Sequence, residues 1–408
     1  MTLVKPRGIA VTGDVHSHLE HPFSLLDGLT RASARMVLAD SGDFFEGTGF
    51  YRLGGGAVER RILAGLYDVL APGNHGFGHY LADPVLRDKT VSANIVDGSG
   101  APVFRRSRSM MVAGVSTLIT AVMSPEAFAT IPAAERAGLK AADPVAMLGA
   151  LTARPQITRG ARQALVVLSH SGWDADVRLA RSCPQISVIF SGHCHSGNHG
   201  PEKVGEVLLL KGREHAEGYA QAHPREGVVW DAKLARFQLP RGVLRQDVKE
   251  LYAQVAELSG KLSQVRGPVR AGWCGTVPDR GALLRLVAGK VLRSARVRAN
   301  AVLLNETLLR PCRLGPSLTT GAVMETAPFA TRLVTVELDE SDLAQLPERL
   351  AGVVGPLVVV RAPGDRSRHR VATSDYLART HLNLPSVDIG PIDPFIERAL
   401  TAGRRART

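Results

Sequence analysis

Two histidines, His193 and His195, stand one residue apart in a glycine turn that follows an apolar run, residues 188–191. Neutral imidazole is the side chain that most often binds metals in proteins, and two imidazoles in one tight turn can reach two neighbouring cations. A surface turn that holds two histidines without a ligand is the simpler interpretation of this motif alone. The motif therefore indicates a metal site only if further ligands join it.

The same arrangement, an apolar run followed by a side chain that can bind a metal, occurs at four earlier points in the sequence. The side chains concerned are Asp14 with His16, Asp43, Asn74, and His170. Asp40 competes with Asp43 for a ligand role, because both carboxylates follow the same apolar run. In open α/β sheets, ligand sites form beyond the carboxyl ends of the strands. We therefore expect five strand ends to meet at one crevice and to bring these side chains together.

The seven ligands are nitrogen and oxygen donors, with no thiolate among them. Such a set suits a pair of divalent cations such as Mn, Fe, Co, Ni or Zn, and two cations can activate water and offset charge on a phosphoryl group. Beside Asn74, the imidazole of His75 offers a group of the kind that transfers protons near neutral pH. The motifs therefore predict a dinuclear metal site with a titratable imidazole, that of His75, beside it.

Apolar runs and helical periodicity outline the elements that position these residues. We expect strands at 8–12, 36–39, 90–95, 111–122, 164–170, 187–195, 333–338 and 356–360, and helices at 57–70, 245–265 and 281–292. Strands that alternate with helices in this way are typical of an α/β fold.

The composition sets limits on the class of protein. A chain of 408 residues with 45% hydrophobic residues and 41 glycines predicts a globular α/β protein of two domains. The formal net charge of +12 favours anionic ligands. Aromatic residues make up only 5% and are not interleaved with basic clusters, so we expect no nucleic-acid partner. The four cysteines form no Cys-x-x-Cys motif and are expected to be reduced thiols.

The N-terminal residues 1–7 lack the apolar core of a signal peptide, and no apolar stretch approaches the length that a bilayer requires. We therefore expect a cytoplasmic protein without a membrane partner. The sequence carries no indication of an oligomeric state.

The metal-ligand motifs resemble the signature of the calcineurin-like metallophosphoesterases, in which Asp-x-His, Gly-Asp, Gly-Asn-His, His and Gly-His-x-His follow one another in this order. The resemblance implies an N-terminal four-layer αββα sandwich, over residues 1–238, that holds two metals. It implies that the ligands are Asp14, His16 and His195 for one metal, Asn74, His170 and His193 for the other, and Asp43 between them.

The resemblance extends to the 5′-nucleotidase branch of that superfamily. Ser92-Ala93-Asn94-Ile95 resembles the strand that follows the Gly-Asn-His block in this branch. Residues 305–329 resemble the branch's Arg, Gly, Thr and Pro-Phe spacing, which implies a second, smaller α/β substrate-binding domain over 271–408. Between the two domains we expect a helical linker, 239–270, with one apolar stripe.

The resemblance also implies three substrate-binding side chains in the C-terminal domain. Arg310 is expected to contact the substrate phosphate or balance its charge, Phe329 is expected to stack on the base, and Tyr376 matches a second stacking aromatic. From the residues alone, Arg310 could equally be a surface charge or form a structural ion pair, and Phe329 could be a core aromatic.

Three departures from the branch's pattern bear on activity and specificity. The block Gly-Asn-His-Glu-Phe-Asp ends here in Gly78, so the aspartate that orients the catalytic histidine is absent, and His79 or a water molecule could replace it. Ala330 and Thr331 replace a Gly-Asn pair whose amide can recognise a base. The Gly-Gly-Asp-Gly block expected after Tyr376 is missing.

The expected function is hydrolysis of a phosphate monoester by a metal-activated water, with His75 assisting the leaving group. A nucleoside 5′-monophosphate or related nucleotide is the expected substrate. A specialised biosynthetic intermediate, such as a modified nucleotide or a sugar phosphate, is the alternative. A module that binds a phosphorylated ligand without turnover is a third interpretation, which the missing aspartate allows.

Overall fold

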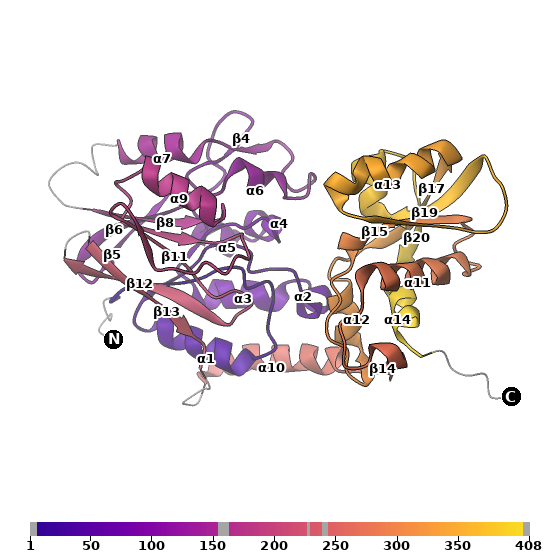
Figure 1. The fold of residues 1–408 in the computed structure, drawn as a ribbon. Helices are drawn as coiled ribbons and strands as arrows, with labels where there is room; N and C mark the ends of the chain where they lie inside the picture. The colour runs from indigo at the N-terminus through magenta and orange to yellow at the C-terminus, as the bar shows by residue number, and fades with distance from the viewer. Residues whose placement is uncertain (1–5, 154–162, 227–228, 239–243, 403–408) are drawn as a thin grey trace. The chain divides into compact units, whose positions relative to one another are not determined.

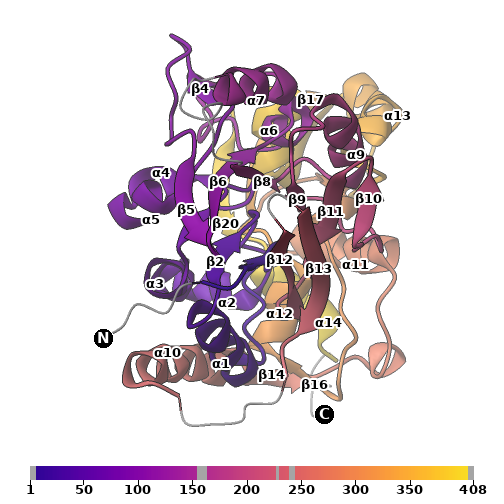
Figure 2. The ribbon, with the colours of Figure 1, turned by 90° about the vertical axis from the view of Figure 1, so that its left-hand side faces the viewer.

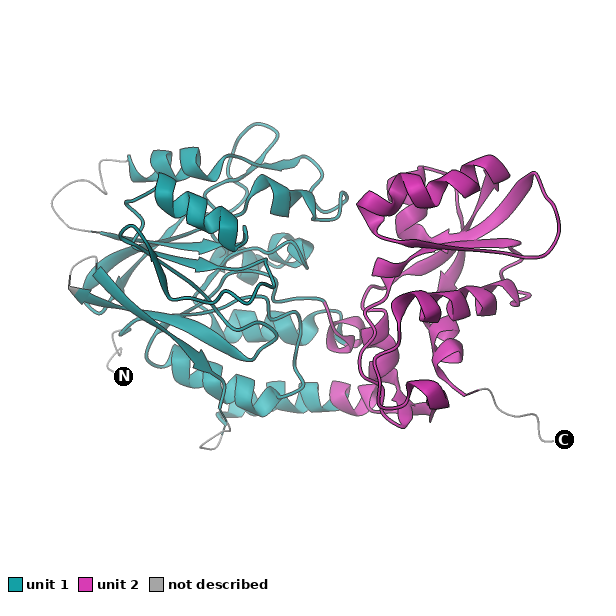
Figure 3. Ribbon diagram, viewed as in Figure 1, with its two compact units in different colours: residues 1–46, 54–257 teal, residues 47–53, 258–408 magenta. Residues whose placement is uncertain are grey.

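The computed structural model describes residues 6–153, 163–226, 229–238 and 244–402 (Figure 1). The chain forms two compact units, which are residues 1–46 with 54–257 and residues 47–53 with 258–408 (Figure 3). Each unit has its own sheets and its own apolar cores. Within the described residues, no helix combines the length and the apolar character needed to cross a membrane.

The first unit contains a five-stranded sheet in the order β13-β12-β1-β2-β3. Its strands are β1 (Ile9–Thr12), β2 (Val37–Asp40), β3 (Val69–Leu70), β12 (Gly218–Glu226) and β13 (Val229–Arg236). β1, β2 and β3 are parallel neighbours, whereas β12 and β13 form an antiparallel ribbon beside β1. The carboxyl ends of β1, β2 and β3 therefore lie at the same edge of this sheet.

The second sheet of this unit has six strands in the order β10-β11-β9-β8-β6-β5 (Figure 2). These strands are β5 (Arg108–Val112), β6 (Val115–Val122), β8 (Ala164–Ser169), β9 (Val188–Ser191), β10 (Glu202–Val204) and β11 (Val207–Lys211). β6, β8, β9 and β11 are parallel neighbours. Every residue of β8, β9 and β11 is buried, as expected for parallel strands that are covered on both faces.

The two sheets pack face to face around one apolar core. Val11 and Ala39 of the first sheet and Val166 and Phe190 of the second are at most 1% exposed in this core. Alternate residues of the second sheet, such as Val167, face a different cluster to which helices contribute. The helices on the outer faces are α1 (Pro22–Ser33) and α3 (Ala57–Leu66) beside the first sheet and α7 (Pro144–Thr152) and α9 (Trp173–Ser182) beside the second (Figure 1). The unit is therefore the expected four-layer αββα sandwich.

The run 111–122, expected as one strand, is a hairpin. β5 and β6 are antiparallel and joined by Ala113 and Gly114, whose φ angles are 49° and 84°. Two consecutive residues with positive φ form the tight turn that suits the twist of a hairpin. The apolar pattern continues through this turn, which is why the sequence did not reveal it.

The segment 90–95 is also less regular than expected, because a strand begins only at its end, with β4 (Ile95–Asp97). The side chain of Asn94 replaces ladder hydrogen bonds here. Its amide nitrogen donates to the carbonyls of Met123 and Ala142, and its oxygen accepts from the Met123 amide. The remaining short elements of this unit are α4 (Phe77–Ala82), α5 (Pro84–Lys89), α6 (Pro125–Ala129) and β7 (Leu139–Ala141).

The second unit contains a five-stranded sheet in the order β18-β15-β19-β17-β20. Its strands are β15 (Ala301–Asn305), β17 (Arg332–Asp339), β18 (Leu357–Arg361), β19 (Arg368–Ser374) and β20 (Val387–Pro391). Its helices are α11 (Arg280–Leu292), α12 (Thr320–Thr326), α13 (Glu340–Val354) and α14 (Asp393–Leu400). A two-stranded ribbon pairs β14 (Val265–Pro268) with β16 (Ser317–Thr319).

Side chains alternate between the two faces of this sheet. Along β15, Val302 and Leu304 join the core that contains α11 and α14, whereas Ala301 and Leu303 join the core that contains α13. The period of two residues is the one that strand geometry imposes. The second unit is therefore a smaller α/β layer structure, with helices on both faces of one sheet.

The helix α10 (Gln246–Leu262) contains the division between the two units, which falls between Glu257 and Leu258. Its buried apolar residues are Val248, Leu251, Val255, Leu258 and Leu262, in the stripe that the sequence indicated. Residues 239–243 of the expected linker lie outside the described residues.

Residues 47–53, expected in the first domain, belong to the second unit and contribute most of α2 (Gly49–Gly54). The Arg52 guanidinium donates two hydrogen bonds to the Asp393 carboxylate, at 2.9 and 2.8 Å, and a third to the carbonyl of Ala327. These partners lie 275 and 341 residues away in the chain. A local sequence pattern therefore could not indicate that residues 47–53 belong to the second unit.

Candidate metal centre

The predicted ligands lie at strand ends, as expected, but two sheets contribute them rather than one. Asp14, Asp43 and Asn74 follow β1, β2 and β3 of the first sheet. His170 and His193 follow β8 and β9 of the second sheet. The rule that sites form beyond the carboxyl ends of parallel strands therefore applies to both sheets of the sandwich at once.

Four of the ligand residues have a left-handed backbone, namely Asp14 (φ 52°), His16 (φ 49°), Asp43 (φ 55°) and His193 (φ 76°). This conformation costs a residue other than glycine on the order of 1 kcal/mol. Such residues persist where the surrounding fold holds them in place, and they cluster at functional sites. The turns after β1, β2 and β9 therefore carry strain at the residues that the sequence assigned to metal binding.

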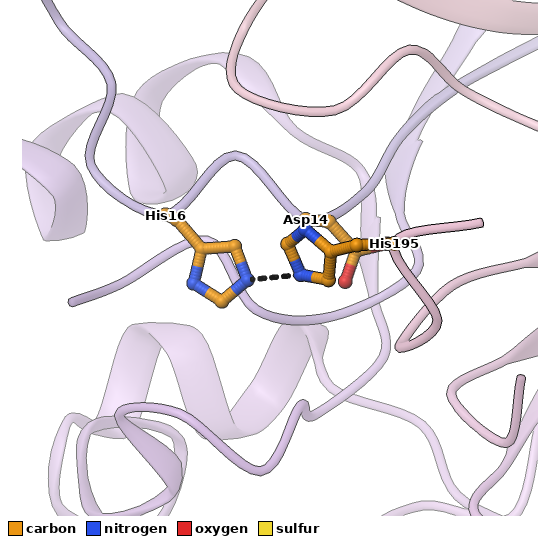
Figure 4. A group of neighbouring side chains, drawn as sticks. All are labelled: Asp14, His16 and His195. Atoms are coloured by element: carbon orange, nitrogen blue, oxygen red, sulfur yellow. Dashed lines mark hydrogen bonds between the residues drawn. The ribbon is translucent and has the colours of Figure 1, made fainter. Parts of the chain in front are cut away.

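The first group of potential ligands consists of Asp14, His16 and His195 (Figure 4). Their donor atoms lie within 4.8 Å of one another, and the Nε2 atoms of the two imidazoles are 3.2 Å apart. The Asp14 carboxylate also accepts hydrogen bonds from the His193 amide, at 3.0 and 3.1 Å. This contact ties the turn after β1 to the turn after β9.

The second group contains Asp43, His170 and His193, whose donor atoms also lie within 4.8 Å of one another. The side-chain oxygen of Asn74 joins this group. It lies 3.0 Å from Nε2 of His170 and 2.9 Å from Nδ1 of His193. Four donors from four strand ends therefore converge on one point.

Asp43 stands between the two groups. Its Oδ2 atom is 3.2 Å from Nε2 of His170 and 3.7 Å from Nε2 of His16. Asp40, the competing carboxylate, is turned away, since it accepts hydrogen bonds from the Thr12 hydroxyl at 2.5 Å and from the Gly42 amide at 2.9 Å. Burial raises the pKa of Asp40 to about 8. Asp43 is therefore the carboxylate that could contact a cation in either group of potential ligands.

Asp43 and His170 form a buried ion pair. Burial alone would raise the pKa of Asp43, but the charge and hydrogen bond of His170, together with His75 and His16, hold it well below its usual range. Burial alone would lower the pKa of His170, but the charge and hydrogen bond of Asp43 raise it to about 9. The proton on His170 therefore balances the negative charge of Asp43 at the point where a bound cation would balance it.

The imidazoles of His16 and His193 favour the neutral form that binds metals, whereas the hydrogen bond with Glu214 raises the pKa of His195. Burial lowers the pKa of His16 well below its usual value, and the charges of neighbouring imidazoles act in the same direction. Burial and the charge of His170 lower the pKa of His193 to about 4. Burial and the charge of Asp43 raise the pKa of Asp14 to about 6, although His170 opposes them. The donors of the cluster are nitrogen and oxygen atoms of imidazoles, carboxylates and an amide, a set that fits divalent cations.

Glu214 is a functional candidate that the sequence analysis missed. One of its oxygens lies 2.9 Å from Nδ1 of His195, and the other pairs with the ammonium of Lys211, which is 1% exposed. The ammonium also donates to the carbonyls of Cys194 and Ser196. Glu214 follows β11, the parallel neighbour of β9, so the strand-end rule extended by one strand would have found it. A carboxylate on the far nitrogen of a ligand histidine fixes its tautomer and orientation.

Two further imidazoles, those of His18 and His215, stack with 4.2 Å between their ring centroids. His215 forms a fourth group of potential ligands with His195 and Glu214. A cation at that point would face the Lys211 ammonium, which already contacts Glu214. The arrangement therefore suits the orientation of His195 better than a further metal.

His75 has a carboxylate partner, contrary to the expectation that its partner was lost with the aspartate at position 78. Its Nδ1 atom is 2.9 Å from an oxygen of Glu46. Burial alone would lower the pKa of His75, but the hydrogen bond with Glu46 and the charges of Asp43 and Glu46 raise it. The replacement considered from the sequence, His79, instead stacks on Phe45 with 4.4 Å between the ring centroids.

The three predicted substrate-binding residues, Arg310, Phe329 and Tyr376, line one pocket of about 480 Å³ in the second unit. The guanidinium carbon of Arg310 lies 5.1 Å from the centre of the Phe329 ring. Phe329 is 38% exposed and Tyr376 is 51% exposed, so Phe329 is not a core aromatic. The pocket also includes Asn305, a 4% exposed residue whose side-chain oxygen has no hydrogen-bond partner among the described residues.

Comparison of the sequence with protein-family models and with curated proteins gave no match. Comparison of the structure with solved structures gave matches over nearly the whole chain. A 5′-nucleotidase precursor from Thermus thermophilus has a TM-score of 0.71 at 19% identity, covering 96% of both chains. A 5′-nucleotidase from Candida albicans has a TM-score of 0.70 at 12% identity, covering 98% of this chain and 99% of that chain.

A third similar structure is that of the sulfate thiohydrolase SoxB from Thermus thermophilus, with a TM-score of 0.65 at 17% identity, covering 95% of this chain and 84% of that chain. Because the identities are below 20%, these likenesses concern the fold. The coverage includes both units, so the comparison extends beyond the sandwich to the smaller α/β unit. The chain has the two-domain fold of these 5′-nucleotidase structures.

Proposed function

We propose that this protein is a metal-dependent phosphomonoesterase whose substrate is a nucleoside 5′-monophosphate or a related nucleotide. The observation that carries the proposal is the position of Asp43 between two groups of nitrogen and oxygen donors, each drawn from several strand ends. Two cations held in this way lower the pKa of water and offset charge on a phosphoryl group when they are bound.

The residues of the chain have distinct tasks in this proposal. Asp14, His16 and His195 would hold one cation, Asn74, His170 and His193 the other, and Asp43 both. His75 would donate a proton to the oxygen that leaves phosphorus, which is the usual contribution of a general acid. A donor is needed because the alkoxide of a ribose is a poor leaving group.

The pocket of the second unit supports a nucleotide as the substrate. Phe329 and Tyr376 present exposed aromatic surface, and a nucleobase offers flat faces that stack on such rings. Arg310 lies over the Phe329 ring and would add positive charge for an anionic ligand. The unpartnered oxygen of Asn305 would accept a hydrogen bond from a base N–H.

A phosphorylated biosynthetic intermediate, such as a modified nucleotide or a sugar phosphate, is the second candidate substrate. Ala330 and Thr331 favour it, because they line the pocket where the nucleotidase pattern has a residue with an amide side chain. The third interpretation, a binding module without turnover, rested on a missing carboxylate beside His75. It loses that support, because Glu46 occupies that position.

The test is phosphate release by the purified protein in the presence of Mn²⁺, Co²⁺, Ni²⁺ or Zn²⁺, from nucleoside monophosphates, sugar phosphates and p-nitrophenyl phosphate. The metal content of the same sample is measured. We expect about two divalent ions per chain and turnover that Asp43→Ala abolishes. The control Asp88→Ala removes an exposed carboxylate that pairs with Arg105 and Arg108, and it should retain activity. A folded protein without metal uptake or turnover would contradict the proposal.

A further inference from the structure

We propose that Glu46 is the positioning residue for His75, and that it takes over the task that the nucleotidase pattern gives to an aspartate at position 78. This inference rests on the proposed function, because His75 is the general acid of that reaction. The hydrogen bonds of Glu46 go to the ring of His75 and to the amide of Gly76. Its effect would therefore be exerted through the orientation of the imidazole.

Both carboxylate oxygens of Glu46 contact the segment that carries His75. One lies 2.9 Å from Nδ1 of the imidazole, and the other accepts a hydrogen bond of 3.0 Å from the amide of Gly76. An ionised carboxylate can only accept hydrogen bonds. The proton of this contact therefore resides on Nδ1, and Nε2 is left for the reaction.

The imidazole is held from two directions by one loop. The amide of His75 donates to Oδ1 of Asp43 at 2.8 Å, while its ring contacts Glu46, three residues further along the chain. Ring nitrogens of His75 and His16 and an oxygen of Asp43 lie within 4.8 Å of one another. The loop 43–46 therefore fixes the general acid relative to the residue that bridges the two ligand groups.

Position 78 does not suit the orienting carboxylate in this chain. The amide of Gly78 donates to an oxygen of Glu135 at 2.7 Å, and a Cβ atom at Gly78 would lie 3.1 Å from that same oxygen. An aspartate there would bring a second carboxylate against Glu135. The glycine at 78 and the glutamate at 46 are thus consistent with each other.

The backbone of Glu46 adds an independent argument. Its φ angle is 66°, in the left-handed region where glycine is the favoured residue. A side chain at such a position is strained, and strain of this kind is kept where the side chain has a task. The next residue, Gly47, also has a positive φ, of 98°. Glycine would suit the backbone at both positions, yet position 46 carries a glutamate.

The role of Glu46 in the reaction follows from the movement of one proton. Water attacks phosphorus, the P–O bond to the alcohol breaks, and the alcohol oxygen takes the proton from Nε2 of His75. The proton released by the attacking water passes to solvent, and the imidazole is reprotonated from solvent. The hydrogen bond with Glu46 holds the orientation of the ring for this transfer. Substrates with a poor leaving group need this proton most.

The experiment compares Glu46→Gln with the wild-type protein on two substrates, a nucleoside 5′-monophosphate and p-nitrophenyl phosphate. Glutamine keeps the size of the side chain, but it has only one oxygen for two donors and carries no charge. We expect kcat for the nucleotide to fall about 100-fold, the lower end of the contribution of a general acid. The nitrophenolate leaves without a proton, so kcat for that substrate should change by less than about threefold. KM and the metal content should stay unchanged.

Two further variants separate a positioning role from a structural one. Glu46→Asp keeps the charge and should restore part of the nucleotide activity. Glu135→Gln is the matched control, since Glu135 accepts a backbone amide hydrogen bond in the same region, from Gly78 rather than from the His75 ring. It should leave the ratio of the two activities as in the wild-type protein.

The outcomes are distinct from those that test the proposed function. Wild-type protein that releases no phosphate with any metal would overturn the proposed function and this inference with it. Active wild-type protein with unchanged Glu46→Gln kinetics would overturn only the inference. An equal loss on both substrates, or a loss of bound metal, would show a structural role for Glu46 and would also overturn it.

Discussion

The candidate metal centre of the first unit and the pocket of the second unit are built in opposite ways. Most of the predicted metal ligands are buried or nearly so, and four have a strained left-handed backbone. In the pocket, Phe329 and Tyr376 are 38% and 51% exposed, and the lining includes charged residues of both signs, Arg310 and Asp375. A preorganised cluster tolerates little change, because each donor is held by the others. An open aromatic pocket tolerates more, because each contact acts nearly alone.

The largest effect is expected from Asp43→Asn. The amide keeps the shape of the side chain but removes the charge that both ligand groups share. We expect kcat/KM to fall about 1,000-fold, which corresponds to about 4 kcal/mol. Bound metal should fall from two ions per chain to one or none. Steady-state kinetics and metal analysis of the same sample check this result. A variant with full activity and both ions would show that the cluster tolerates change as well as the pocket does.

The next effect concerns the carboxylate behind His195. Glu214→Gln removes the charge that Lys211 and His195 share, while the size of the side chain is kept. We expect the affinity of one metal site to fall about 10- to 100-fold, as is usual for such supporting residues. Metal titration followed by calorimetry measures it. The control Glu217→Gln changes an exposed carboxylate in the same loop and should bind both ions as the wild-type protein does.

A smaller and more selective effect is expected in the pocket. Stacking of a base on an aromatic ring contributes about 1–3 kcal/mol, so Phe329→Ala should raise KM for a nucleoside monophosphate about 10-fold with kcat nearly unchanged. Tyr376→Phe keeps the ring and should bind as the wild-type protein does. The reaction with p-nitrophenyl phosphate should not change in either variant. An equal loss of activity on both substrates would show that Phe329 stabilises the fold and does not recognise the base.

The sequence predicted the potential metal ligands, but it did not predict the partner of His75. Each predicted metal ligand stands within a few residues after a buried strand, so a local pattern and one rule of sheet geometry were enough to bring Asp14, Asn74 and His193 together. The same rule, applied one strand further, would have included Glu214. The partner of His75 could not be found in this way. Glu46 lies in a loop with unusual backbone angles, and its contact depends on how that loop turns.

Long-range contacts also set the limit for the fold. The layers follow from apolar runs and their spacing, but the place of residues 47–53 depends on the ion pair between Arg52 and Asp393, which no local pattern shows. The hairpin turn at Ala113 was hidden for a different reason. Its residues are compatible with a strand, and only their positive φ angles separate β5 from β6.

The last prediction concerns the support beneath the metal centre. Asp176 of α9 is fully buried and accepts hydrogen bonds of 2.5 Å from the hydroxyls of Ser169 and Ser191, the last residues of β8 and β9. Burial raises the pKa of Asp176 from its ordinary 3.8 to about 7, although both hydrogen bonds oppose the shift. The carboxyl group therefore favours its protonated form in the folded protein.

The sign of the pH effect follows from this raised pKa. Below about pH 4 the group is protonated in both the folded and the unfolded chain, and its stabilising contribution is fully present. As the pH rises toward 7, the unfolded chain loses the proton first, so the contribution is lost at up to about 1.4 kcal/mol per pH unit. Asp176→Asn carries no ionisable group and should abolish this loss. Urea unfolding of the metal-free wild-type and variant proteins at about pH 5 and about pH 7 measures the change in the free energy of unfolding with pH. An equal pH dependence in the two proteins would show that protonation of Asp176 does not contribute to stability.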